Sequence, residues 1–283
     1  EVRLGDRKQT LVDVAVSGAS ADKLAELDAA LKPLPQTYTV RSVAAENVTL
    51  AFADGIGTLT LNRPESLNAL SQAMMESLER QLRAVAGLAG LRVVLITGAG
   101  RAFCAGGDLV EFEAALHPDG QRLLDTLRYN QDVLQLVEDL PVPVIGVVNG
   151  TAVAGGLELL LCCDIIVAAA GAKIGDGHSR YGIVPAGGAT VRLRERISPA
   201  RAAQLFYTGA LIEAETLAGW GLINEVVPEE RLMDRALEIA GEIASRSPEA
   251  NRRIKALTGR AAVAMDRDTR LRELAGRPGL FGE

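Results

Sequence analysis

The chain has 283 residues, of which 48% are hydrophobic and 23% are charged, and its formal net charge is −6. This is enough apolar material for one large domain, with or without a smaller appendage. Basic residues are scattered along the chain, which argues against a nucleic-acid-binding protein, and charged residues interrupt every hydrophobic run before it could span a membrane.

The cysteines and histidines argue against disulfides and a metal site. Cys104, Cys162 and Cys163 cannot all pair with one another, and two of them are neighbours in an apolar run. We therefore expect reduced thiols in a cytoplasmic protein. The two histidines, His117 and His178, do not have the spacing of zinc ligands, so no metal is expected.

Residues 1–45 differ in character from the rest of the chain. Leu11 to Val16 alternate between apolar and polar, which predicts a short strand, and Ser20 is suited to cap a helix that runs to about Lys32. Two prolines within residues 33–35 then end the helical pattern. We expect residues 1–45 to form an appendage and a linker.

The predicted main domain, residues 46–198, begins with a hairpin. Val48–Phe52 and Ile56–Leu61 are rich in strand-forming residues, and Asp54-Gly55 between them supplies the positive φ that a tight primed turn requires. The apolar positions of Met74–Val85 then recur with the spacing of a helix.

Strands and helices alternate along the rest of this domain. Val93–Thr97 and Val142–Val148 are β-branched runs typical of buried strands, and a glycine-rich turn follows each. This alternation indicates an α/β fold. Residues 199–283 are predicted to be helical, most clearly at 201–207 and 229–246, with apolar faces that could close the core or contact another subunit.

The two glycine-rich turns are the candidate chemical elements. Residues 101–109 contain Gly106-Gly107, and residues 149–158 contain Gly155-Gly156 at the start of a predicted helix. Adjacent glycines let the backbone approach a ligand and direct N–H groups at an oxygen, and a helix N-terminus favours negative charge. Together the turns could form an oxyanion hole for a thioester enolate, although each alone could simply be a tight connection.

The order of several motifs resembles that of the crotonase (enoyl-CoA hydratase/isomerase) superfamily, from about Val48 to about Leu257. These motifs are Asn62-Arg63-Pro64, Asn68-Ala69-Leu70, residues 102–109, Asn149-Gly150, residues 154–158, Cys163-Asp164-Ile165, Tyr207-Thr208-Gly209, residues 218–221 and Val226-Val227-Pro228. The resemblance implies a core of repeated ββα turns and a C-terminal helical region that forms a homotrimer or a dimer of trimers. It also implies an acyl-CoA or acyl-carrier thioester as substrate, without a further cofactor.

The resemblance also assigns roles to the glycine-rich turns. It places the oxyanion donors at the N–H groups of Gly107 and Gly155. It further implies that Gly107, Asp108, Leu109 and Val110 border the CoA.

Hydratases of this family place two glutamates at the β-carbon, one to add hydroxide from water and one to handle the proton. Glu158 falls on the first position, although a glutamate in a first helical turn can also simply stabilise the helix dipole. Counting without a gap from Asp164, the second position falls on His178. An imidazole can serve as acid or base near neutral pH, but a histidine in a glycine-rich loop can equally be a solvated residue. Asp176 could orient this imidazole or replace it.

Three alternative functions remain open. Asp176-Gly177-His178 with residues 182–185 resembles crotonase-fold β-diketone hydrolases, which use a histidine to help water cleave a C–C bond, although the acidic partner expected at 186–188 is absent. Residues 181–185 with 188–190 resemble crotonase-like dehydratases or decarboxylases that act on carrier-bound thioesters. The missing second glutamate also leaves open a non-catalytic acyl-thioester-binding module.

Overall fold

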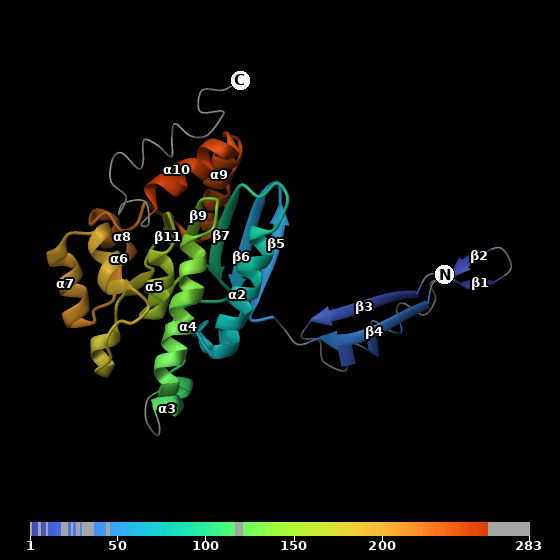
Figure 1. Cartoon of the computed structure of the whole chain (residues 1–283), viewed down its shortest axis with the longest axis horizontal. Coiled ribbons are helices and arrows are strands. Elements are labelled where there is room, and N and C mark those ends of the chain that lie inside the picture. Colours follow the sequence, from blue (N-terminus) through green and yellow to red (C-terminus); the bar gives the residue numbers. More distant parts are fainter. Residues whose placement is uncertain are drawn as a thin grey trace. The chain divides into compact units, whose positions relative to one another are not determined.

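The computed structural model of the chain (Figure 1) divides it into two compact units, residues 1–46 and residues 47–283. The structure describes residues 2–4, 7–9, 11–17, 22, 23, 25, 26, 29, 37–43, 46–116 and 121–259.

The first unit contains two pairs of strands. Strands β1 (Val2–Leu4) and β2 (Arg7–Gln9) pair antiparallel, and β3 (Leu11–Ser17) pairs parallel with β4 (Thr37–Val43). The strand predicted from Leu11 is therefore confirmed. The helix predicted between Ser20 and Lys32 is helical at the five positions described within it, and its other residues lie outside the described part of the chain.

A six-stranded sheet is the centre of the second unit (Figure 1). Its strand order is β14-β11-β9-β7-β6-β5. The strands are β5 (Val48–Ala53), β6 (Ile56–Leu61), β7 (Val93–Gly98), β9 (Val144–Val148), β11 (Ile165–Ala169) and β14 (Glu225–Val227). Only β5 and β6 pair antiparallel, joined by the predicted turn, in which Asp54 has a φ of 52° and Gly55 a φ of 79°. The hairpin prediction is confirmed.

A smaller sheet with the order β13-β12-β10-β8 lies in the same unit. Its strands are β8 (Ala102–Cys104), β10 (Thr151–Val153), β12 (Lys173–Gly175) and β13 (Ile212–Glu213). Each of β7, β9 and β11 in the large sheet is followed by one of β8, β10 and β12 in the small sheet and then by helix, which makes a ββα repeat. This mixed α/β architecture is the predicted crotonase-like core.

The helices of this unit follow the strands in chain order. They are α2 (Gln72–Ala86), α3 (Leu109–Leu116), α4 (Gln121–Glu138), α5 (Gly155–Leu161), α6 (Ala189–Arg196), α7 (Pro199–Thr208), α8 (Ala214–Gly219), α9 (Leu232–Ala244) and α10 (Pro248–Thr258), with 3-10 turns at Pro64–Ser66 (η1), His178–Tyr181 (η2) and Glu229–Arg231 (η3). The part of the predicted helical region that the structure describes, residues 199–259, thus contains four α-helices, and it also supplies the short edge strands β13 and β14.

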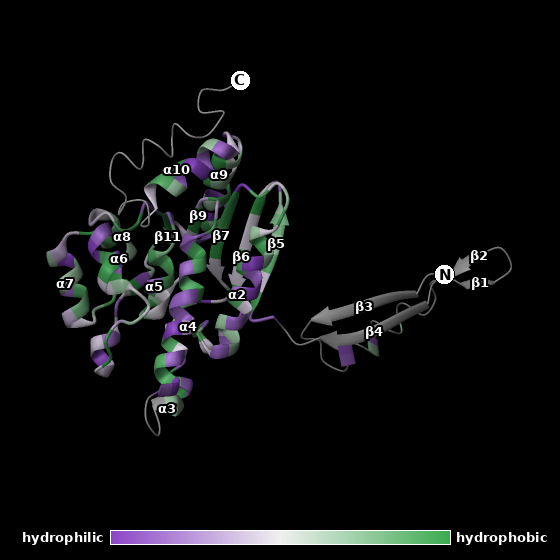
Figure 2. Ribbon diagram, viewed as in Figure 1, coloured by the Kyte–Doolittle hydropathy of each residue, from purple (hydrophilic) through white to green (hydrophobic). Residues whose placement is uncertain are grey.

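The large sheet is buried on both faces. Along β7, Val94 and Ile96 pack into one hydrophobic cluster together with the apolar residues of α2. The alternate residues, Val93 and Leu95, face the other way and pack with α9. Because side chains alternate across a strand, this explains why the sequence of β7 is continuously apolar. In Figure 2 the helices α2 and α4 carry both hydrophilic and hydrophobic bands, as expected for helices with one face on the core.

Asn68 links the turn after β6 to the turn between β7 and β8. Its side chain is fully buried, and its Nδ2 donates to the carbonyl oxygens of Ala99 at 2.9 Å and Ala102 at 2.8 Å. Its Oδ1 accepts a hydrogen bond from the backbone N–H of Arg63 at 2.9 Å. Its φ of 56° lies in the left-handed region, which asparagine tolerates better than most residues.

Replacing Asn68 should therefore destabilise the fold. Asn68→Ala removes three hydrogen bonds, leaves the Ala99 carbonyl and the Arg63 N–H without this partner and places alanine at a positive φ, so we expect the free energy of unfolding to fall by about 3 kcal/mol. Denaturant titration measures this change. Asn251→Ala, which removes one hydrogen bond to the Ile243 carbonyl, is the control and should cost about 1 kcal/mol or less. Equal losses in the two variants would contradict this role of Asn68.

Candidate active site

The candidate site lies where three strands of the small sheet end. β8, β10 and β12 are neighbours and run parallel, so their carboxyl ends meet at one edge. Gly107 follows β8, Gly155 follows β10 and His178 follows β12. Residues that are far apart in the sequence are therefore brought together by the pairing of three short strands.

The N–H of Gly107 points away from Leu70, the residue with which Gly107 forms a bridge of the kind found between parallel strands. Leu70 N–H donates to the Gly106 carbonyl at 2.7 Å, and Asp108 N–H donates to the Leu70 carbonyl at 3.3 Å. These two bonds form a parallel bridge between Leu70 and Gly107, which leaves the N–H of Gly107 on the opposite side. A Cβ atom at Gly107 would have nothing within 4 Å, so this glycine borders open space.

The N–H of Gly155 lies close to that of Gly107. Gly155 is the first residue of α5, and the N–H groups in a first helical turn have no acceptor within the helix. A Cβ atom on Gly155 would lie 3.5 Å from the nitrogen of Gly107, and one on Gly106 would lie 3.3 Å from the nitrogen of Gly155. Within the described part of the chain, neither N–H donates to a protein acceptor. Both are therefore available to a single ligand oxygen.

The entry to α5 is held in a sparsely populated backbone conformation. Ala154 has a φ of 53° and a ψ of −116°, and its N–H donates to the carbonyl of Gly175 at 3.1 Å. Such strain persists only where the surroundings impose it, and it is typical of functional sites. Here the hydrogen bond joins the end of β10 to the end of β12 and fixes the direction in which Gly155 presents its N–H.

Glu158 is almost completely buried beside these donors, with 4% of its surface exposed. It lies in the first turn of α5, and its Oε1 accepts a hydrogen bond from the N–H of Ala189 at 3.2 Å. Burial raises the pKa of Glu158 above its ordinary value, while the nearby His178 and the N–H groups of Ala189 and Gly187 lower it in part. Its carboxyl group can therefore take up or release a proton closer to neutral pH than an exposed glutamate.

His178 is paired with Asp176. The Nδ1 atom of His178 lies 3.0 Å from Oδ1 of Asp176, whose side chain is 1% exposed. Burial opposes the charged imidazolium, but the hydrogen bond to Asp176 and the charges of Asp176 and Glu158 outweigh it and raise the pKa of His178. Because Nδ1 is engaged, Nε2 is the nitrogen left to face the cavity.

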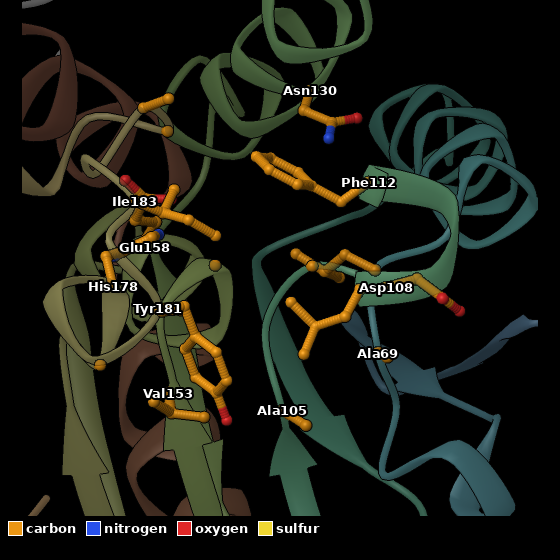
Figure 3. Close-up of a pocket in the computed structure, with 18 of the residues that line it drawn as sticks. Ala69, Ala105, Asp108, Phe112, Asn130, Val153, Glu158, His178, Tyr181 and Ile183 are labelled. Atoms are coloured by element: carbon orange, nitrogen blue, oxygen red, sulfur yellow. The ribbon is translucent and has the colours of Figure 1, made fainter. Parts of the chain in front are cut away.

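A cavity of about 660 Å³ contains all of these groups. The predicted site residues that line it are Gly107, Asp108, Leu109, Val110, Gly155, Glu158 and His178. Figure 3 shows Glu158 and His178 on one side of the cavity and Phe112 on the other. The structure thus brings every predicted site residue to one place.

Two helices contribute residues to the cavity wall that the sequence analysis did not predict as site residues. Phe112 comes from α3, and Leu127, Asn130 and Leu134 come from one face of α4. Their helical spacing is a visible signal, but it is the same signal as that of an ordinary core-facing helix.

The structure also shows the state of the cysteines and whether the described residues form a metal-binding cluster. All three cysteines are buried, free thiols, and burial raises the pKa of Cys104, the last residue of β8, to about 12. Among the described residues, no group of three or more His, Cys, Asp and Glu side chains could hold a metal ion. No helix in the described ranges is long and apolar enough to cross a membrane.

Comparison with known proteins supports the relation inferred from the motifs. Residues 51–277 match the family model described as enoyl-CoA hydratase/isomerase. The chain belongs to the enoyl-CoA hydratase/isomerase family. It is an acyl-CoA-processing enzyme of this family.

Relatives in the enoyl-CoA hydratase/isomerase family carry different activities. Crotonyl-CoA hydratase of Syntrophomonas wolfei is 37% identical over 76% of this chain and 82% of its own length. The 1,2-epoxyphenylacetyl-CoA isomerase of Escherichia coli is 38% identical over 68% of this chain and 73% of its own. Among solved structures, the enoyl-CoA hydratase of Bacillus anthracis superimposes with a TM-score of 0.75 and 36% identity, over 81% of this chain and 88% of that one.

The glycine pair of α5 allows a direct test of the oxyanion hole. In Gly155→Ala, the methyl group would lie 3.5 Å from the Gly107 nitrogen, and its tightest neighbour, at 2.9 Å, is the flexible end of the Leu70 side chain. We expect this variant to fold and to lose about 10²–10³ in kcat, because the methyl group occupies the oxygen position. Steady-state kinetics with crotonyl-CoA measures the loss.

Gly156→Ala is the matched comparison. Its methyl group would collide with the carbonyl oxygen of Cys104, which belongs to the backbone and cannot easily move. We therefore expect this variant to lose thermal stability, in contrast to Gly155→Ala. Full activity in Gly155→Ala would contradict the oxyanion role.

Proposed function

We propose that this enzyme hydrates 2-enoyl thioesters of CoA, with the N–H groups of Gly107 and Gly155 as the oxyanion hole and with Glu158 and His178 as the proton-transfer groups. The observation that carries the proposal is that two free N–H donors and two titratable side chains line one cavity. Each step of the reaction needs only proton transfer by side chains and two hydrogen bonds to the thioester oxygen. We therefore propose that no further cofactor takes part.

Polarisation of the thioester carbonyl begins the reaction. As the oxygen of water bonds to the β-carbon, the electrons of the double bond move to the α-carbon and the thioester oxygen, which gives an enolate. The N–H groups of Gly107 and Gly155 bind this oxygen more strongly as its charge grows, which lowers the barrier. The enolate then takes a proton at the α-carbon, and the 3-hydroxyacyl thioester is complete.

Glu158 and His178 divide the two proton transfers. We assign Glu158, as the carboxylate, to remove a proton from water, because burial makes it a stronger base than an exposed glutamate. We assign His178, as the imidazolium, to protonate the α-carbon, because Asp176 and Glu158 stabilise its charged form. In this scheme His178 takes the place of the second family glutamate, and Asp176 fixes the imidazole with Nε2 toward the cavity.

We also propose that the enzyme assembles as a trimer or a dimer of trimers and is located in the cytoplasm. Met233 and Leu237 on α9 and Ile254 on α10 are exposed apolar side chains, which support packing of this region against other subunits in a trimer or a dimer of trimers. The three free cysteines support a cytoplasmic location, where thiols stay reduced.

A second candidate is hydrolysis of a β-diketone. The contact between His178 and Asp176 favours it, because an imidazole held by a carboxylate can activate water for attack on a carbonyl carbon. Calorimetric binding of an acyl-CoA would weigh against this candidate. Binding without turnover of any thioester would indicate a non-catalytic module, and turnover of a carrier-bound thioester alone would indicate a biosynthetic dehydratase or decarboxylase.

Variants at the two titratable residues test the assigned roles. Glu158→Gln and His178→Gln should each lower kcat for hydration of crotonyl-CoA by roughly 10²–10⁴, because each removes one proton-transfer group. His178→Glu restores the family pattern and should retain much more activity than His178→Gln. Binding of a saturated acyl-CoA, measured by calorimetry, is the control for an intact site. Unchanged turnover in both glutamine variants would refute the assignment.

The pH dependence of kcat/KM should be bell-shaped. Activity rises with pH as Glu158 loses its proton and falls as His178 loses its own, and both pKa values are raised from their ordinary values. Asp176→Asn removes the group that raises the pKa of His178, so the basic limb should move to lower pH. Asp125→Asn, at a side chain that is 62% exposed, is the charge-matched control and should move neither limb. A basic limb that stays in place in Asp176→Asn would contradict the scheme.

A further inference from the structure

Asn130 is a polar side chain in the wall of the cavity, on helix α4. Figure 3 shows its carboxamide next to the ring of Phe112, across the cavity from Glu158 and Ile183. The other cavity residues of the same helix face, Leu127 and Leu134, are apolar. Asn130 therefore places a carboxamide in an otherwise apolar part of the wall.

This carboxamide has no partner in the described part of the chain. Its Oδ1 is buried and accepts no hydrogen bond from the described residues. Nearby polar side chains of α4 are paired, since Tyr129 donates to Glu79 at 2.7 Å and Gln135 donates to Asp139 at 2.9 Å. Buried polar groups nearly always have a partner, and a wall that only enclosed an alkyl chain would be served better by leucine.

The position of Asn130 relative to the reacting carbons follows from α4. A Cβ atom on Gly187 would lie 2.7 Å from the carboxyl carbon of Glu158 and 3.0 Å from Cδ1 of Leu134, so Leu134 is beside the catalytic carboxyl. Asn130 is one helical turn from Leu134, about 6 Å along the axis. A group that meets Asn130 therefore lies several bonds from the carbons beside Glu158.

We infer that Asn130 determines substrate specificity by hydrogen bonding to a hydroxyl group on the acyl chain, so that the enzyme acts on hydroxylated enoyl thioesters. A hydroxyl both donates and accepts, so it satisfies whichever end of the carboxamide faces it. This inference rests on the proposed hydratase function and adds the substrate class to it.

A series of matched thioesters tests the inference. Each trans-2-enoyl-CoA of increasing chain length is compared with its ω-hydroxy analogue, in which a hydroxyl replaces the terminal methyl group. At the chain length that reaches Asn130, the wild type should prefer the hydroxylated member by about ten-fold in kcat/KM. Asn130→Leu should reverse this preference.

Leu127→Val is the control, because it trims the same wall without a polar group and should change both members of a pair alike. Calorimetric binding of the matched saturated acyl-CoA pair reports the same contact without turnover. Absence of hydration in every wild-type assay would overturn the proposed function, while the binding preference would still test Asn130. An equal preference in the wild type and Asn130→Leu, in turnover and in binding, would overturn the inference about Asn130.

Discussion

The parallel pairing of β8, β10 and β12 is the constraint on which the site depends. Each of these strands has only three residues, and each ends at the same edge of the small sheet. The large sheet behind them is buried on both faces, so it supplies the rigidity that such short strands lack. Backbone hydrogen bonds between these strands position the glycine N–H groups. The side chains of Glu158 and His178, which follow β10 and β12, then line the same cavity.

The electrostatics of the site follow from the same arrangement. Burial favours the neutral forms of Glu158 and His178. Their mutual attraction opposes burial for both groups, and the charge of Asp176 opposes it for His178 but adds to it for Glu158. The charged forms of the pair are therefore more accessible than burial alone would allow. The proposed oxyanion donors need no such compensation, because a helix start by its geometry leaves the N–H of Gly155 without an acceptor within the helix.

Much of the fold could be predicted because its signals are local. The hairpin from Val48 to Leu61 depends on a two-residue turn, and α2 depends on apolar spacing over fifteen residues. The three short strands of the small sheet gave no such signal. A three-residue strand is too short for a period, and β8 pairs with β10 across about fifty residues of chain, so the residue pattern indicates only glycine-rich turns there.

The two glycine-rich turns, their order among the family motifs, and the presence of Glu158 and His178 can all be read from the sequence, because each is a local property of a few residues. The three-dimensional structure was needed to show that both glycine N–H groups border one opening, that Asp176 contacts His178, and that Asn130 faces the cavity from α4. The first and last of these relations depend on contacts between segments that are distant in the chain, and the second depends on the conformation of the loop after β12. A helical pattern shows which residues share a face, but only packing decides whether that face meets the core or a substrate.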